Sequence, residues 1–303
     1  MRVGAPLGTT VGMHRKKKEI IMAIDELMTM YLAAQGAFFE GDYAIAESIL
    51  RTAAGRGHPN SQCMLGLLYE LGRGVPKNLH LALEWYHKSA AQDYADAQVS
   101  IGRCYDRGVG VPQNYGQAVL WFQKAAEAGF ADGQFELGQM YEVGTGVPQD
   151  YQKSFFWYSQ AAAQGLDLAQ HRLGCAYIEG KGVEPNNRRA FEWLSKAAEQ
   201  GHADAQGIIG TMYATGLAAV PQDHALARKW LTMASDQGIA NAQFVLDSYY
   251  PDPVNGPRLP AGVVPGIVKF LHQLAREEQC APPHNRQQRR AEQRSRRRDA
   301  RRR

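Results

Sequence analysis

The sequence predicts an all-α protein, a solenoid of helix-turn-helix repeats with a period of 36 residues. Two observations predict this fold: every tryptophan falls in one phase of the chain, and each period can form two amphipathic helices. Successive tryptophans are 36, 36, 36 and 37 residues apart. They are Trp85, Trp121, Trp157, Trp193 and Trp230. Chance does not place all the tryptophans of a chain in one phase, so the period must be structural.

Three other residue types repeat in step with the tryptophans. A glutamine recurs as Gln62, Gln98, Gln134, Gln170, Gln206 and Gln243. A glycine recurs as Gly66, Gly102, Gly138, Gly174 and Gly210. A tyrosine recurs as Tyr69, Tyr105, Tyr141, Tyr177 and Tyr213. The extra residue of the last period falls in a loop, where insertions are tolerated.

Each period can form two helices, as residues 96–129 illustrate. Apolar residues follow Ala97 at steps of four, which is the spacing of one face of a helix. We predict Asp96 and Asn114 as the N-caps of the two helices, because short polar side chains accept backbone N–H bonds there. Gly108 ends the first helix, since glycine readily adopts a positive φ. The equivalent caps of the other second helices are Asn78, Asp150, Asn186 and Asp223.

The small and large residues of the repeat have complementary roles in packing. Gly102 and Ala118 are predicted to let the two helices of a hairpin approach closely. The tryptophan and tyrosine side chains would then fill the gaps between neighbouring hairpins. An aromatic side chain of this size buries roughly 150–250 Å², which a single hairpin cannot provide. The pattern therefore predicts that the hairpins stack on one another.

The ends of the repeat region are predicted to be incomplete units. Residues 27–57 fit the frame weakly, with Gly36 in the place of the loop glycine. Residues 241–250 supply a closing helix. The solenoid is therefore predicted to cover residues 25–250, with five full repeats, and to follow a flexible segment at 1–24.

The C-terminal part has a different composition. Five prolines at 251–265 predict a linker, residues 266–280 predict a short amphipathic helix, and residues 281–303 predict a disordered basic tail. The chain has a net charge of +4, but residues 286–303 alone carry +8, so the rest sums to −4. The ten arginines of the tail are Arg286, Arg289, Arg290, Arg294, Arg296, Arg297, Arg298, Arg301, Arg302 and Arg303.

These arginines make the tail a candidate polyanion-binding segment. A guanidinium group can hold a phosphate at two points and stack on bases. A disordered arginine-rich segment can also become ordered on RNA. Nucleic acid, an acidic protein surface and an anionic lipid are the alternative partners, and a solvated extension without a binding role is the fourth possibility.

The repeat resembles the Sel-one-like repeat family, a relative of the tetratricopeptide repeats. The matching string is Ala-Asp-Ala-Gln-x-x-x-Gly-x-x-Tyr at 95–105, Gly-x-Gly-Val-Pro at 108–112 and Ala-x-x-Trp-x-x-Lys-Ala-Ala at 118–126. The resemblance covers about 27–250. It implies a right-handed α/α superhelix with a concave face that binds protein partners, and a role as an adaptor.

The outward side of the first helices is the candidate partner-binding groove. Counted from the repeated glutamine, the core takes offsets +3, +4 and +7, so offsets +1, +5 and +8 are predicted to lie opposite it, in solvent. These positions vary between repeats whereas the core does not, and solenoids bind through such a face. The candidate groove residues are Val99, Arg103, Asp106, Phe135, Gln139, Glu142, His171, Cys175 and Ile178.

No motif indicates a catalytic site, a metal or a cofactor. The sequence has no G-x-S-x-G, H-E-x-x-H or Walker-type loop, and the repeated G-x-G-V-P follows a helix, which indicates a turn. His58 and His202 share one position of the repeat, interpreted as a solvated loop. The four cysteines fall at unrelated positions and predict neither disulfides nor a zinc site. They are Cys63, Cys104, Cys175 and Cys280.

The predicted function is a non-enzymatic adaptor that binds a protein through the solenoid and uses the arginine-rich tail as a second, electrostatic contact. The alternative is an RNA- or ribosome-associated protein in which the tail makes the main contact. No apolar run approaches the roughly 18–20 residues that span a bilayer. The apolar stretch after the first basic residues is cut short by Asp25 and Glu26, so we expect a cytoplasmic protein.

Overall fold

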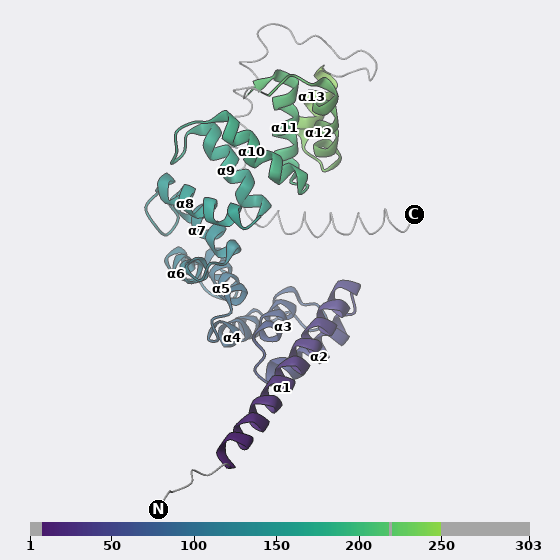
Figure 1. Ribbon diagram of the computed structural model, residues 1–303, viewed down its shortest axis with the longest axis vertical. Helices are drawn as coiled ribbons and strands as arrows, with labels where there is room; N and C mark the ends of the chain where they lie inside the picture. The colour runs from purple at the N-terminus through teal and green to yellow at the C-terminus, as the bar shows by residue number, and fades with distance from the viewer. Residues whose placement is uncertain (1–7, 218–219, 250–303) are drawn as a thin grey trace, which may run out of the picture. The chain divides into compact units, whose positions relative to one another are not determined.

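The computed structural model describes residues 8–217 and 220–249 (Figure 1). Within these ranges the chain forms thirteen α-helices and no strand, which confirms the predicted all-α class. The predicted linker, amphipathic helix and tail at 251–303 lie outside the described residues. The chain divides into two compact units, with the boundary between Gly133 and Gln134, and each unit is a stack of helical hairpins.

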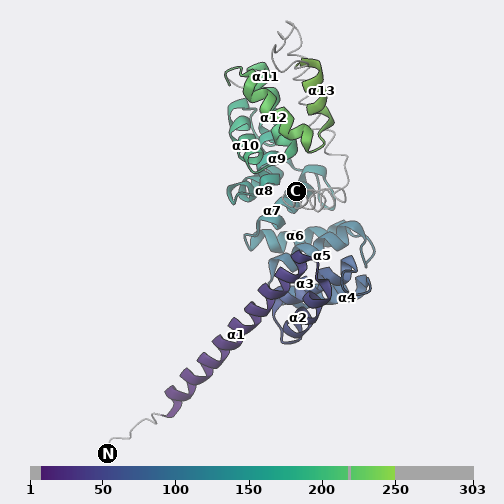
Figure 2. The ribbon, with the colours of Figure 1, turned by 90° about the vertical axis from the view of Figure 1, so that its right-hand side faces the viewer.

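The first unit contains three hairpins. Each helix packs against its partner in the hairpin, and the second helix of one hairpin packs against the first helix of the next. In Figure 2, the long helix α1 extends beyond α2 and α3. The helices are α1 (Gly8–Glu40), α2 (Tyr43–Gly55), α3 (Pro59–Leu71), α4 (Leu79–Ala90), α5 (Ala95–Arg107) and α6 (Tyr115–Glu127).

The second unit continues the same pattern. Helices α9 and α10 form one hairpin, α11 and α12 the next, and α13 packs against α12 as the predicted closing helix. The helices are α7 (Ala131–Val143), α8 (Tyr151–Ala163), α9 (Asp167–Glu179), α10 (Asn187–Glu199), α11 (Ala203–Thr215), α12 (His224–Asp236) and α13 (Ala240–Tyr249).

The second helix of every full repeat begins at the predicted N-cap. The side chains of Asn78, Asn114, Asp150, Asn186 and Asp223 each accept a backbone N–H bond from the first turn of their helix. The same five residues donate their own backbone N–H to the carbonyl oxygen of the repeated tyrosine in the preceding helix. This backbone bond fixes where the second helix starts relative to the first.

The cap of the first helix differs from the prediction. Helix α5 begins at Ala95, and its N-cap is Tyr94, whose side chain makes no capping bond. Asp96 lies in the first turn, where its carboxylate is favoured by the positive end of the helix dipole. The prediction that Asp96 is the N-cap is therefore wrong.

A pair of adjacent asparagines allows a direct test of capping. The Asn186 side chain accepts from the backbone N–H of Arg189 at 3.0 Å, whereas exposed Asn187 is the first residue of α10. Asn186→Ala should lower the free energy of unfolding by about 1 kcal/mol, because it leaves a helix N–H without its acceptor. Urea unfolding followed by circular dichroism measures the change, and Asn187→Ala is the control. Equal losses from both variants would rule out the capping role.

The residue after each tryptophan is the one that fills the hairpin. These residues are almost completely buried: Tyr86, Phe122, Tyr158, Leu194 and Leu231. Each lies against the repeated glycine of the first helix, so that a Cβ on Gly102 would lie 2.5 Å from Cε1 of Phe122. The predicted close approach at this glycine is confirmed in all five repeats.

The tryptophans themselves lie at intermediate exposure. The Trp121 ring contacts the His87 ring of the preceding hairpin, with the centroids 5.5 Å apart, which agrees with the prediction that indoles pack between hairpins. Trp85 and Trp121 lie at the edge of the core of the first unit. Position in the helix explains why the tryptophan is more exposed than the residue after it. Successive side chains are rotated by about 100° around the helix axis, and this rotation places the residue after the tryptophan against the glycine.

The opening unit also differs from the prediction. Gly36 is not a loop glycine, since it lies inside α1, and the turn comes at Gly41 with a φ of +93°. Helix α1 begins at Gly8, within the segment 1–24 that the sequence predicts to be flexible. The guanidinium of Arg56 holds both carboxylate oxygens of Glu26, at 2.9 and 2.8 Å, which ties α1 to the end of α2.

Candidate partner-binding site

The structure buries four of the nine predicted groove residues. Val99, Phe135, His171 and Cys175 are 2, 4, 3 and 7% exposed, so the prediction that they face solvent is wrong. The other five lie at intermediate exposure, as expected for residues that a partner could reach. They are Arg103 and Asp106 in the first unit, and Gln139, Glu142 and Ile178 in the second.

Helix geometry accounts for the four buried residues. Offsets +1, +5 and +8 lie only about 120° from the centre of the core stripe, not directly opposite it. Each first helix packs against its own second helix and against the previous hairpin, as α5 does with α6 and α4. The flank at about 120° is therefore partly covered. Phe135 illustrates this, because its ring packs on Tyr158 with the centroids 5.6 Å apart.

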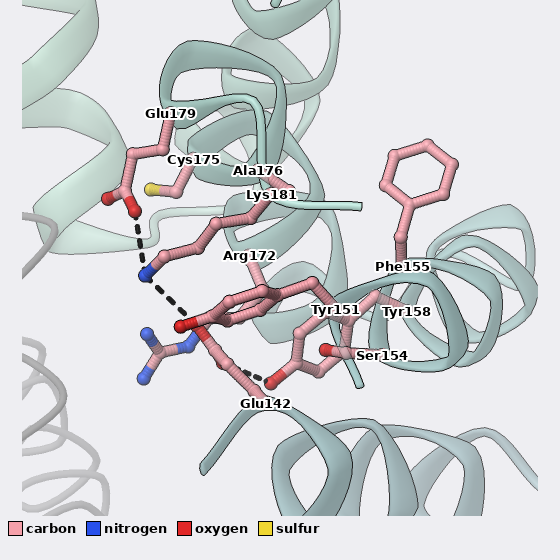
Figure 3. A pocket seen from close by; sticks show the side chains of 10 residues that line it. All are labelled: Glu142, Tyr151, Ser154, Phe155, Tyr158, Arg172, Cys175, Ala176, Glu179 and Lys181. Atoms are coloured by element: carbon pink, nitrogen blue, oxygen red, sulfur yellow. Dashed lines mark hydrogen bonds and ion pairs between the residues drawn. The ribbon is translucent and has the colours of Figure 1, made fainter. Parts of the chain in front are cut away.

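The second unit holds a polar cluster that includes one of the predicted residues, Glu142 (Figure 3). The ammonium group of Lys181 lies 2.7 Å from Glu179 Oε2 and 3.9 Å from Glu142 Oε1. The three side chains are only 22, 13 and 12% exposed, in the order Lys181, Glu179, Glu142. Lys181 Nζ also lies 5.5 Å from the centroid of the Tyr151 ring, a cation–π contact. One cation thus joins the end of α7, the start of α8 and the loop after α9.

Glu142 also has a structural role. The buried Tyr158 hydroxyl donates to Glu142 Oε2 at 2.6 Å, and the Tyr86 hydroxyl donates to Glu70 Oε2 at 2.7 Å two repeats earlier. Burial, followed by the neighbouring carboxylate, raises the pKa of each tyrosine well above its usual value. The hydroxyls therefore remain hydrogen-bond donors at neutral pH, and Glu142 is held in place from within the protein.

The lining of the same cluster includes Arg172 and Cys175 of α9, which are 6 and 7% exposed. The Cys175 sulfur lies 3.4 Å from His171 Nε2, and the His171 ring stacks on His202 at 4.4 Å between centroids. This places a thiol beside an imidazole, but both are packed in the interior. At its surface the cluster exposes only part of the ion pair between Lys181 and its two carboxylates.

The repeated histidine position is not a solvated loop, so that interpretation is wrong. His58 is 8% exposed, and its Nδ1 lies 2.8 Å from the Ser61 hydroxyl. Burial lowers the His58 pKa, which favours the neutral ring. His202 is the N-cap of α11 and accepts from the backbone N–H of Ala205 at 3.3 Å. Both rings serve the start of a first helix.

Sequence reasoning missed a row of cation–π pairs on the second helices. In three repeats, the ammonium group of a lysine lies over the indole ring of the tryptophan three residues earlier in the chain. The distances from the lysine nitrogen to the ring centroid are 4.1, 4.4 and 4.0 Å. The pairs are Trp85 with Lys88, Trp121 with Lys124 and Trp193 with Lys196. The signal was present in the Trp-x-x-Lys spacing, which puts both side chains on one face of a helix. The stacked lysine covers the indole face that the core leaves open.

Two cysteines of the first unit, Cys104 and Cys63, are poor nucleophiles. Burial raises the pKa of the Cys104 thiol to about 12, with a further contribution from Glu70. Burial, followed by the charge of Asp96, raises the pKa of Cys63 to about 12 as well. A thiol with such a pKa is almost entirely protonated at neutral pH. These two residues therefore serve packing in the first unit.

Among the described residues, no group of three or more histidine, cysteine or acidic side chains is placed to hold a metal ion. Among the helices that the structure describes, none has the length and apolar character needed to span a membrane.

Each full repeat has a glycine in its first helix, a buried residue after its tryptophan and a capped second helix. These shared features define an all-α repeat solenoid. The Sel1 repeat family matches residues 59–94, 95–130, 131–166, 167–202 and 203–239. These five repeats cover more than half of the chain, so the chain belongs to the Sel1 repeat family, and the resemblance seen in the sequence is confirmed. Sel1 repeat proteins are generally protein-interaction scaffolds, and the fold is typically non-catalytic.

Solved structures agree with this assignment. A Sel1 repeat protein from Oxalobacter formigenes is 30% identical, with a TM-score of 0.68, over 82% of this chain and 99% of that one. The protein c5321 of uropathogenic Escherichia coli, a protective antigen with an SLR fold, is 32% identical, with a TM-score of 0.63, over 83% of this chain. The match spans 54% of the length of c5321. No curated protein sequence matches the chain.

Proposed function

We propose that this protein is a non-enzymatic adaptor that binds a partner protein through half-exposed side chains of its first helices. The observation that carries the proposal is the five-repeat Sel1 stack, whose core is repeated while the accessible positions differ from one repeat to the next. A surface that varies on a constant scaffold is what selective binding requires.

Each unit contributes its own accessible set. In the second unit, Gln139 and Ile178 lie at intermediate exposure, and Lys181 with its two carboxylates supplies charge. In the first unit, Arg103 is 27% exposed and lies 3.6 Å from Asp132. A partner that contacts these sets would meet a mixture of apolar, amide and charged groups, as at the rim of ordinary interfaces.

The arginine-rich tail would add a second contact. Residues 286–303 carry +8, which favours an acidic surface on the same partner. Two linked contacts raise the overall affinity through effective concentration. RNA binding by the tail is the alternative, in which release of counterions would make retention fall steeply with salt.

The experiment is affinity capture with three versions of the full chain. The first is wild type, and the second carries Gln139→Ser and Ile178→Ser. The third carries Leu120→Ser and Phe156→Ser, on exposed positions of second helices, as the matched control. The proposal predicts loss of a specific protein only for the second version, with the circular dichroism of all three unchanged. Normal capture by the second version would place the binding surface elsewhere.

Deleting residues 286–303 separates the two roles of the tail. An adaptor should keep its protein partner after nuclease treatment and lose only part of the affinity. An RNA-binding protein should instead lose polyanion retention completely, and wild-type retention should fall steeply across a salt series.

A further inference from the structure

The repeated glutamine takes part in a ladder of amide hydrogen bonds. In four hairpins it accepts at Oε1 from the Nε2 of a second glutamine, located at the end of the second helix of the same hairpin. The donor–acceptor pairs are Gln92–Gln62 at 2.9 Å, Gln164–Gln134 at 2.8 Å, Gln200–Gln170 at 2.8 Å and Gln237–Gln206 at 2.6 Å. The amide pair therefore joins the first and second helices of each of these hairpins, at the end of the hairpin away from its loop.

Several rungs of the ladder extend further. Gln62, Gln170 and Gln206 each donate their own Nε2 to a backbone carbonyl eight residues earlier, at 3.1, 3.3 and 3.0 Å. Gln92 and Gln200 also donate to the carbonyls of Gly57 and Gly165, at 3.0 Å each. The amide groups thus link one hairpin to the turn that precedes it.

The hairpin formed by α5 and α6 lacks its rung. The residue that corresponds to Gln92 and Gln164 is Ala128, which has no side-chain donor. Its would-be acceptor, Gln98, is 4% exposed, and its Oε1 is buried without a hydrogen-bond partner. A buried carbonyl without a donor costs about 1–3 kcal/mol, so this position is the weak point of the ladder.

A cavity of about 590 Å³ that is open to solvent lies beside Gln98 and Ala128, within the first unit. Its lining includes Gln98, Ala128, Asp93, Trp121, Lys124 and Glu127. The lining thus includes Gln98, whose amide oxygen is unsatisfied, an indole, and charged groups of both signs. The cavity is large enough for a side chain, and Gln98 in its lining has an amide oxygen that lacks a donor.

We propose that this cavity binds a primary carboxamide, the side chain of a glutamine or asparagine of a protein partner, which donates an N–H to Gln98 Oε1. The chain itself argues for this group, because in four other hairpins a carboxamide makes the same bond. For its natural ligand the site rests on the adaptor function proposed above. The site itself can be tested without a partner.

The test titrates the full chain with acetyl-glutamine N-methylamide while the indole N–H resonance of Trp121 is followed by NMR. The Trp121 resonance is assigned with Trp121→Phe. We expect a saturable shift of this resonance and of the Gln98 side-chain amide. Acetyl-glutamate N-methylamide, which has no side-chain N–H at neutral pH, should not produce it. The absence of a saturable shift, or an equal shift with the glutamate derivative, overturns the proposal.

Ala128→Gln supplies the missing rung from within the chain. This variant should lose the Trp121 shift on titration and melt about 2–4 °C higher, because the buried oxygen gains a donor. Ala163→Gln places the same side chain at an exposed position at the end of α8 and should keep both the shift and the wild-type melting temperature. An Ala128→Gln variant that still binds the amide as wild type does would show that the cavity is not the site. Because no lysate partner is involved, this result is independent of the capture experiment.

Discussion

Phe122→Ala should lower the free energy of unfolding by about 3–5 kcal/mol. The Phe122 ring is 0% exposed and packs on Gly102 of the facing helix, so its removal leaves a hole in the middle of the α5–α6 hairpin. Neither glycine nor alanine at these positions can fill that hole. Because repeat proteins can unfold unit by unit, hydrogen exchange of α5 and α6 is measured together with urea unfolding of the whole chain.

The matched control for this prediction is the neighbouring Trp121→Ala. The indole is half-buried and stacks under Lys124, with the ammonium nitrogen 4.4 Å from the ring centroid. Its removal should cost less, about 1–2 kcal/mol, since the indole lies at the edge of the core and is only partly buried. A larger loss for Trp121→Ala than for Phe122→Ala would show that the tryptophan, and not Phe122, holds the hairpin together.

Gly182→Ala should lower the free energy of unfolding by about 2–4 kcal/mol. Gly182 has a φ of +72°, a conformation that alanine adopts only with strain. An added Cβ would also overlap the carbonyl group of Tyr151, the first residue of α8. The substitution therefore pushes the loop after α9 away from the hairpin before it. Urea unfolding followed by circular dichroism measures the loss.

Gly165→Ala separates the two contributions. Gly165 also has a positive φ, +90°, but a Cβ there would meet nothing within 4 Å. Its substitution should cost only the backbone strain, about 1–2 kcal/mol. If both variants lose the same free energy, the close approach of the loop to α8 contributes nothing.

Much of the fold could be predicted because the same sequence pattern occurs in five repeats. The N-cap of each second helix, such as Asn114, is local chemistry that one short stretch of sequence contains. The close approach at Gly102 could be predicted because a repeated glycine inside a helix needs a packing reason. Helix ends at glycine are equally local, as Gly108 shows with its φ of +70°.

The accessible face could not be predicted as well, because exposure depends on the neighbours of a helix. Val99 and Phe135 are buried by elements that helical periodicity alone does not include. Helical periodicity alone also does not single out the residue after each tryptophan, since a difference of one position decides which side chain meets the glycine. The amide ladder joins residues 30 or 31 positions apart, a spacing that only the packed hairpin reveals.

The central claim is that the residue after each tryptophan is seated on the repeated glycine. The most direct measurement is the effect of Gly102→Ala on urea unfolding in two backgrounds. In the wild-type protein a Cβ at 102 meets Phe122 at 2.5 Å, so the loss should be about 1–3 kcal/mol. In Phe122→Ala the space is free, and Gly102→Ala should instead stabilise the protein by about 0.5–1 kcal/mol through its higher helix propensity. The same loss in both backgrounds would contradict the account.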